Sequence, residues 1–339
     1  MKSAAVIKLM LAAFVMISVA RAGTLGLYPV DTPDGARLSA EAVQLGEYLF
    51  FDKRLSLDES LSCASCHEPG KAYADPRPHS PALGKPRHRR NATSLLNVGY
   101  RRSLGWDGNA RTLEQQFEQS FGPYGDMGIS LSDAIGRLES DPRVVESCRS
   151  AFASEVNASC LARAVAAFER NLVSGSSRFD RFLFGNESGV LTERERHGWE
   201  LFSGKAACID CHDVFHPSVN PLGGAYATFS DERFHNLGVG HSNGRMSDTG
   251  RYDVTRDPAD FGSFKTPMLR NVRHTAPYMH DGSLSTLAEV IDFYDRGGND
   301  NEHKTAGVKR LFLSTEEKAA LVAFLESLDA DYYVATASN

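Results

Sequence analysis

The sequence predicts a mainly helical protein in which two similar domains follow one another along the chain. The chain has 339 residues, of which 42% are hydrophobic and 24% are charged, as in an ordinary globular protein. This length corresponds to about two domains. One segment recurs, as Gly46-Glu-Tyr-Leu-Phe50 and Gly198-Trp-Glu-Leu-Phe202, and each copy is expected to end a helix that leads into a cysteine pair. No segment shows a strong alternating strand pattern, so we expect helices joined by long loops.

The N-terminus has the features of a secretory signal peptide. Lys2 and Lys8 precede an apolar run over residues 9–20, and Ala20-Arg21-Ala22 fits the rule for cleavage after small residues. The run is short for a membrane span, although an uncleaved anchor is the alternative. We expect residues 1–22 to be removed from an exported protein. Because the segment carries three basic residues and no acidic one, the net charge then falls from -6 to -9, which disfavours nucleic acid as a partner.

Four of the six cysteines belong to two copies of the pattern C-x-x-C-H, namely Cys63-Ala-Ser-Cys66-His67 and Cys208-Ile-Asp-Cys211-His212. This pattern attaches c-type haem: the two thiols bond to the porphyrin, and the histidine is the proximal iron ligand. Paired zinc motifs are an alternative, but they usually lie about 15–20 residues apart, whereas these lie in different halves of the chain. A thioredoxin-like pair would not explain either histidine. We therefore predict two covalently bound haems c in two cytochrome c-like domains.

The remaining cysteines, Cys148 and Cys160, are expected to form a structural disulfide, as is common in exported proteins. A redox-active pair is the alternative.

The domain boundary is expected within residues 174–185, where Gly and Ser cluster after a helical run from Leu161 to Leu172. This division gives an N-terminal haem domain over residues 23–178 and a C-terminal haem domain over residues 179–339.

Two capping boxes predict the starts of helices in the C-terminal domain, at Thr192-x-x-Glu195 and Ser314-x-x-Glu317. Residues 70–90 and 213–250 lack periodicity and are expected to be loops that cover a ligand.

Three further segments resemble the bacterial dihaem cytochrome c peroxidases and MauG. They are Asn91-Ala-Thr-Ser-Leu-Leu-Asn97, Trp106-Asp-Gly108 and Phe264-Lys-Thr-Pro-Met-Leu-Arg-Asn-Val-Arg-His-Thr-Ala-Pro-Tyr-Met-His-Asp-Gly282. With the haem motifs, the resemblance runs from about Leu45 to the C-terminus. It implies a periplasmic enzyme in which the first haem reacts with hydrogen peroxide and the second transfers electrons.

The second iron ligand of the C-terminal haem distinguishes two functions within this family. The ligand position lies fourteen residues after the histidine of the Pro-Tyr-x-His motif. The peroxidases have a methionine at this position, and MauG-like proteins have a tyrosine. In this chain the histidine is His280, and the residue fourteen positions later is Tyr294. A capping box at Thr286-x-x-Glu289 and the apolar spacing that follows predict a helix that turns Tyr294 inward. A phenolate stabilises higher iron oxidation states, whereas methionine raises the potential. A core tyrosine, with Met279 as the ligand, is the alternative.

At the first haem, we expect a coordination position that is open to peroxide. The position that matches a distal histidine of the related peroxidases is Leu83. His79 and His88 are nearby but out of register, and we interpret them as solvated loop residues.

The resemblance places Gln116 and Asp126 in the pocket above the first haem. Cleavage of peroxide needs a group that moves a proton between its oxygens and stabilises the departing hydroxide. Asp126 stands where the family pattern has Glu, and Ser120 stands where it commonly has Pro. Trp106 resembles an indole that lies between the two haems and can carry oxidising equivalents between them; a buried core tryptophan is the alternative.

The resemblance also implies a calcium site between the domains, formed by Asn91, Thr275 and Pro277. A side-chain oxygen and backbone carbonyls suit this hard cation.

The leading hypothesis is a MauG-like oxidase that uses peroxide to oxidise a protein, as MauG does in completing tryptophan tryptophylquinone in the methylamine dehydrogenase precursor. One departure is Ala206, where MauG has a tryptophan before the second haem motif; Trp199 could substitute, although helix packing explains it more simply. A cytochrome c peroxidase that takes electrons from a small cytochrome c or cupredoxin is the alternative. A dihaem electron carrier without catalysis is a third hypothesis.

Overall fold

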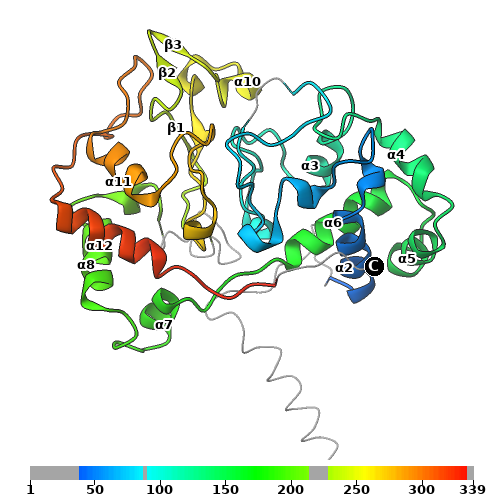
Figure 1. Ribbon diagram of the computed structural model, residues 1–339, viewed down its shortest axis with the longest axis horizontal. Coiled ribbons are helices and arrows are strands. Elements are labelled where there is room, and N and C mark those ends of the chain that lie inside the picture. The colour runs from blue at the N-terminus through cyan, green and yellow to red at the C-terminus, as the bar shows by residue number, and fades with distance from the viewer. Residues whose placement is uncertain (1–37, 87–89, 214–227, 334–339) are drawn as a thin grey trace, which may run out of the picture.

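The computed structural model describes residues 38–86, 90–213 and 228–333. The expected signal peptide and His88 lie outside these ranges. The described chain is mainly helical, as predicted, and its longer helices form two groups that lie side by side (Figure 1). Within the described residues, every helix is too short or too polar to cross a membrane.

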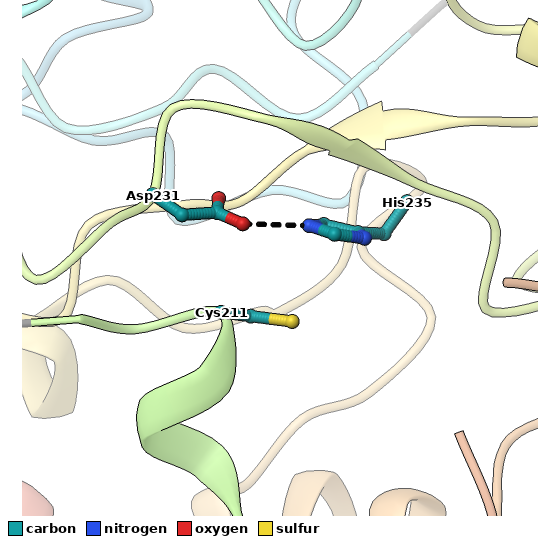
Figure 2. A group of neighbouring side chains, drawn as sticks. All are labelled: Cys211, Asp231 and His235. Atoms are coloured by element: carbon teal, nitrogen blue, oxygen red, sulfur yellow. Dashed lines mark hydrogen bonds and ion pairs between the residues drawn. The ribbon is translucent and has the colours of Figure 1, made fainter. Parts of the chain in front are cut away.

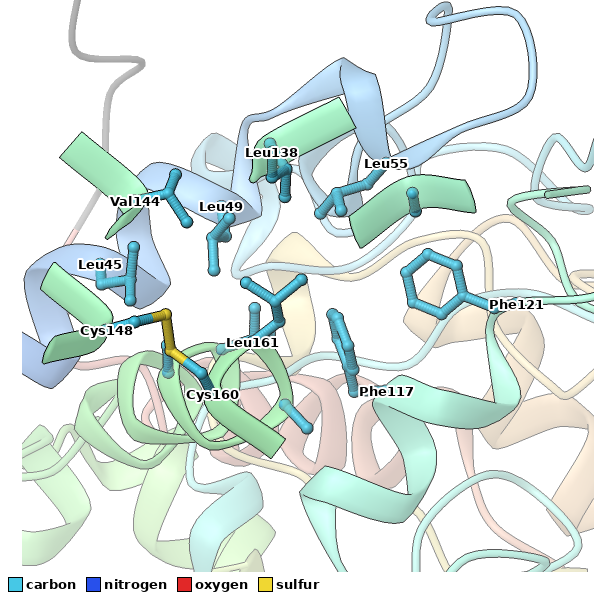
Figure 3. Close-up of a cluster of buried hydrophobic side chains, with 14 of the residues drawn as sticks. Leu45, Leu49, Leu55, Phe117, Phe121, Leu138, Val144, Cys148, Cys160 and Leu161 are labelled. Carbon is cyan, nitrogen blue, oxygen red and sulfur yellow. A yellow bond between two sulfur atoms is a disulfide. The ribbon is translucent and has the colours of Figure 1, made fainter. Parts of the chain in front are cut away.

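The first group comprises α2 (Ala40–Phe50), α3 (Leu113–Gln119), α4 (Leu131–Leu138), α5 (Pro142–Phe152) and α6 (Ala158–Asn171). Helix α2 lies so close to α6 that a Cβ added at Gly46 would be 2.0 Å from the carbonyl oxygen of Ala164. A disulfide between Cys148 and Cys160 joins α5 to α6 beside the apolar core of this group (Figure 3). The predicted disulfide is therefore confirmed.

The second group comprises α7 (Arg178–Phe184), α8 (Glu193–Ser203), α11 (Leu287–Asp295) and α12 (Thr315–Glu326). Both hydrogen bonds of the predicted capping boxes form at the starts of α8, α11 and α12. A Cβ added at Gly198 of α8 would be 2.0 Å from the carbonyl oxygen of Ala320 in α12. The repeated sequence segment thus corresponds to a repeated contact between two helices.

The other elements are short. They are η1 (Lys53–Leu55), η2 (Cys63–Ser65), η3 (Pro69–Lys71), η4 (Val98–Tyr100), η5 (Cys208–Asp210), α10 (Tyr252–Thr255), η6 (Pro258–Asp260), η7 (Val272–His274), β1 (Phe234–His235), β2 (His241–Ser242), β3 (Arg245–Met246) and β4 (Phe264–Lys265). The strands form two antiparallel pairs, β1 with β4 and β2 with β3.

The segment in which we expected the domain boundary contains helix α7. Phe179 of α7 is fully buried, and its ring packs against those of Phe229 and Phe324 in the second group. The phenylalanines of this helix supply an apolar face that packs against the core of the second group.

Candidate haem centres

The second C-x-x-C-H motif lies on the wall of a cavity of about 650 Å³. The motif forms the turn η5, in which the backbone amides of Cys211 and His212 both donate hydrogen bonds to the carbonyl of Cys208. His212 is buried, and its Nδ1 lies 2.8 Å from the carbonyl oxygen of Phe229. Nδ1 is therefore the donor nitrogen, which leaves Nε2 to bind a metal. Burial lowers the pKa of His212 to about 4, so the ring is neutral and able to act as a ligand.

The first C-x-x-C-H motif has the same local geometry. The amides of Cys66 and His67 donate to the carbonyl of Cys63, over 3.2 and 2.9 Å. Nδ1 of His67 lies 3.1 Å from the carbonyl oxygen of Tyr73. Both motifs thus present two thiols and one neutral, oriented imidazole, the groups that a covalent haem c requires.

Tyr294 lies on α11 and lines the cavity together with Cys208, Cys211 and His212. Burial raises the pKa of its phenol. An ionised phenolate there needs a nearby positive charge, which a bound iron would supply. Met279, the alternative ligand, lines the same cavity. The structure thus brings both candidates to the second haem motif.

Two cationic side chains in this cavity fit the carboxylates of a haem. Arg101 and Lys265 both line it, and Nε of Arg101 is buried without a hydrogen-bond partner among the described residues. Nζ of Lys265 lies 3.2 Å from Glu232 Oε2. Burial, followed by the charge of Arg101, lowers the pKa of Lys265 to about 8. A buried guanidinium with an unused donor is the partner that a carboxylate requires, so the residues present fit the prosthetic group.

Trp106 also lines the cavity, and hydrogen bonds hold it at both ends. Its indole Nε1 donates to the carbonyl of Asn91 over 2.8 Å, and its own carbonyl accepts from the amide of Lys265 over 2.8 Å. Its ring centroid is 6.3 Å from that of His280. The indole is therefore held in one orientation, by residues from both halves of the chain.

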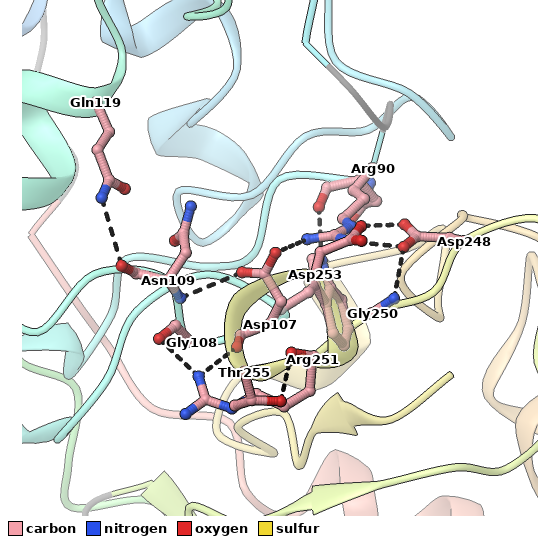
Figure 4. A network of polar contacts seen from close by, with 12 residues as sticks. Arg90, Asp107, Gly108, Asn109, Gln119, Asp248, Gly250, Arg251, Asp253 and Thr255 are labelled. Carbon is pink, nitrogen blue, oxygen red and sulfur yellow. Dashed lines mark hydrogen bonds and ion pairs between the residues drawn. The ribbon is translucent and has the colours of Figure 1, made fainter. Parts of the chain in front are cut away.

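The residue after Trp106 belongs to an ionic network (Figure 4). The guanidinium of Arg90 lies 2.7 Å from Asp107 and 2.7 Å from Asp248. Nη1 of Arg251 donates to the carbonyls of Asp107 and Gly108, over 2.7 and 2.9 Å. These two arginines fix the turn that carries Trp106, a contact that sequence reasoning missed because its partners lie far apart in the chain.

The residues predicted for the first distal pocket have different environments. Gln116 lies on α3, and its Oε1 is buried without a hydrogen-bond partner among the described residues. Asp126 is exposed, and its backbone carbonyl accepts from the amide of Leu83 over 2.8 Å. Burial, then the negative charges of Asp75 and Asp126, raise the pKa of Cys66 to about 12.

Other residues that the sequence singled out have simpler environments. His79 is exposed. The hydroxyl of Ser120 donates to the carbonyl of Gln116. Trp199 packs against Phe179, Phe202 and Phe324, as the packing interpretation predicts, and Ala206 lines the cavity.

The three residues predicted to bind calcium all line the cavity: Asn91, Thr275 and Pro277. Nδ2 of Asn91 donates to the carbonyls of Asp75 and Arg77, over 2.9 and 2.8 Å. Its Oδ1 is consequently the side-chain atom left to accept or to bind a cation.

One further cluster was not predicted from the sequence. Cys211, Asp231 and His235 have potential ligand atoms within 4.8 Å of one another (Figure 2). Nε2 of His235 lies 2.9 Å from Asp231 Oδ2. Because Cys211 belongs to the haem attachment motif, we interpret the Asp231–His235 pair as part of the haem wall. The spacing of four between these two residues was the only sequence signal.

Comparison with known proteins identifies the family. The family profile described as "Di-haem cytochrome c peroxidase" matches residues 40–188. The methylamine utilization protein MauG of Methylorubrum extorquens is 36% identical over 306 residues, which cover 89% of this chain and 82% of that protein. This chain belongs to the di-haem cytochrome c peroxidase and MauG family.

Two further family members show the breadth of the match. The cytochrome-c peroxidase IdrP1 of Pseudomonas sp. (strain SCT) is 34% identical over 336 residues, covering 89% of this chain and 84% of that protein. The crystal structure of a MauG-like protein associated with microbial copper homeostasis superposes with a TM-score of 0.78 at 34% identity, covering 90% of this chain and 94% of that chain.

Family membership establishes a haem-dependent oxidoreductase of the peroxidase type with two haems c and two cytochrome c-like domains. Hydrogen peroxide and a protein that donates electrons are its implied reactants. Relatives named MauG and relatives named peroxidase match with similar identity, so the choice between them depends on the residues of the site.

Proposed function

We propose that this protein is a periplasmic MauG-like dihaem oxidase that uses hydrogen peroxide to oxidise a protein substrate. The observation that carries this proposal is the position of Tyr294, which lines the cavity beside Cys208, Cys211 and His212. Ligation by a phenolate would disfavour reduction of that iron and favour storage of an oxidising equivalent.

The bound haems would supply the oxidative chemistry with peroxide. His67 and His212 would be their proximal ligands, oriented by the carbonyls of Tyr73 and Phe229. Asp126 and Gln116 would move a proton from one peroxide oxygen to the other and stabilise the departing hydroxide. Trp106, held at both ends by hydrogen bonds, would carry electrons between the two centres.

We further propose that Asn91, Thr275 and Pro277 hold a calcium ion between the two halves of the chain. Their common position on the cavity wall and the available Oδ1 of Asn91 support this assignment.

The resemblance to MauG suggests the methylamine dehydrogenase precursor as the protein substrate, with tryptophan tryptophylquinone as the product. The alternative is a peroxidase that draws electrons from a small cytochrome c or cupredoxin. Met279 favours that alternative, because it lines the same cavity as Tyr294 and would give the second iron a sulfur ligand.

The deciding experiment supplies peroxide to the haem-loaded protein with either reduced cytochrome c or the methylamine dehydrogenase precursor. We expect the quinone absorbance to develop in the precursor and the oxidation of cytochrome c to be slow. Fast, sustained oxidation of cytochrome c without any change in the precursor would contradict the proposal and support the peroxidase.

A further inference from the structure

The chain beyond α12 returns to the first group of helices (Figure 1). The hydroxyl of Tyr332 accepts a hydrogen bond from the amide of Ala72 over 3.0 Å. The carbonyl of Tyr333 accepts one from the hydroxyl of Tyr73 over 2.9 Å. The rings of Tyr73 and Tyr332 meet edge to face, with centroids 6.3 Å apart. The C-terminal segment therefore forms hydrogen bonds with two consecutive residues, Ala72 and Tyr73, which lie 260 positions earlier in the chain.

The second of these residues, Tyr73, orients the proximal histidine of the first haem. The carbonyl of Tyr73 accepts from His67 Nδ1 over 3.1 Å, and also from the amide of Leu95 over 3.3 Å. Ala72 and Tyr73 are fully buried, with φ angles of 53° and 55°. Residues other than glycine keep this left-handed conformation only where surrounding contacts hold them. The hydrogen bonds that Tyr332 and Tyr333 accept from Ala72 and Tyr73 are contacts that can hold this conformation.

The second haem motif has the same hydrogen bond without the C-terminal segment. The carbonyl of Phe229 accepts from His212 Nδ1, and Phe229 is also fully buried, with a φ of 52°. Its ring packs against Phe179 within its own group of helices. Phe229 has no hydroxyl, so the hydrogen bond from Tyr73 to the C-terminal segment has no counterpart there.

We propose that Tyr332 and the backbone of Tyr333 are positioning residues for the first haem, acting through Ala72 and Tyr73 on His67. A hydrogen bond from Nδ1 to a carbonyl makes the imidazole a stronger electron donor to its metal. Such hydrogen bonds are one of the means by which a protein sets a haem potential. The C-terminal segment thus strengthens the bond between His67 and iron and lowers the potential of the first haem. This inference goes beyond the proposed function, since it holds equally for an oxidase and for a peroxidase.

Two variants of the haem-loaded protein test this role. Tyr73→Phe removes only the hydroxyl that binds the carbonyl of Tyr333, and a chain that ends at Asp331 removes the whole contact. Tyr333→Phe is the matched control, because the hydroxyl of Tyr333 makes an exposed hydrogen bond to Glu47 over 2.8 Å, while its carbonyl stays in place.

The readouts are the resonance Raman iron–histidine stretch of the reduced protein and the potential of each haem by redox titration. In both variants, we expect the iron–histidine band of the first haem to move to lower frequency and its potential to become more positive. The potential of the second haem should stay unchanged, as should the band and both potentials in Tyr333→Phe.

The proposal is overturned if both variants lose thermal stability while the first haem keeps its band and its potential, because the segment would then only fasten the two groups of helices. Tyr73→Phe preserves the volume of the ring, so it decides the question even if the shortened chain does not fold. No protein substrate is present in these measurements, so their outcome is independent of the choice between oxidase and peroxidase.

Discussion

Asp126 is a residue that the sequence predicts for the site, although its environment could not be predicted. The family pattern predicts an acid at this position, and the negative charge of Asp126 contributes to the raised pKa of the Cys66 thiol. Its exposure was not predictable, because it depends on the packing of the loop against Leu83, whose amide binds the Asp126 carbonyl. An exposed acid can exchange protons with water.

We therefore expect Asp126→Asn to slow the reaction of the oxidised protein with peroxide by roughly 10²–10⁴-fold, the usual contribution of general acid–base catalysis. Stopped-flow absorbance in the Soret region would measure this rate. Asp133→Asn on α4 is the control, because its carboxylate accepts from the hydroxyl of Ser130 at the start of that helix. An unchanged rate in Asp126→Asn would remove this residue from the reaction.

At the scale of elements, the sequence predicts helices where local signals suffice. Capping boxes identify the starts of α8, α11 and α12 because their hydrogen bonds join residues three positions apart. Helix α7 also begins at a capping box, between Ser177 and Asp180, a local signal that the sequence analysis missed. The burial of Phe179 against a distant core adds a contact that no local pattern predicts. The repeated glycines were visible in the sequence, but the close helix contact that requires them was not.

We expect Gly46→Ala and Gly198→Ala each to destabilise the protein by about 1–3 kcal/mol, because the added methyl group collides with a backbone carbonyl of the facing helix. Chemical denaturation of the haem-loaded protein would measure the change. Gly136→Ala on α4 is the matched control: nothing lies within 4 Å of the added Cβ, so the substitution should be neutral or stabilise by about 0.5–1 kcal/mol. Equal effects at all three positions would contradict the proposed contact.

At the scale of the whole molecule, contacts between distant segments hold the two groups of helices together. Arg90 and Asp248 are 158 positions apart, and no periodicity or motif connects them. The same is true of the C-terminal segment and Tyr73. The sequence therefore predicts the haem motifs and Tyr294 as site residues, but not the ionic network that fixes the turn carrying Trp106.

Removing the charge of Arg90 should weaken this connection. Arg90→Met leaves the buried carboxylates of Asp107 and Asp248 without their cation, so we expect a loss of about 3–5 kcal/mol in unfolding free energy. Arg149→Met, which breaks an exposed pair with Glu146, should cost less than about 1 kcal/mol. Denaturation midpoints of the two variants would measure the difference, and equal midpoints would show that the network contributes little.

The central claim is that Tyr294 is the second ligand of the C-terminal haem iron. Redox titration of Tyr294→Met, with optical spectra recorded at each potential, tests it most directly, and Met279→Leu serves as the control. Because methionine raises a haem potential and a phenolate stabilises the oxidised iron, we expect Tyr294→Met to change the low-spin spectrum of the second haem and to make its potential more positive, while Met279→Leu changes neither. If Tyr294→Met leaves both unchanged and Met279→Leu alters them, Tyr294 is a packing residue and the MauG-like assignment is wrong.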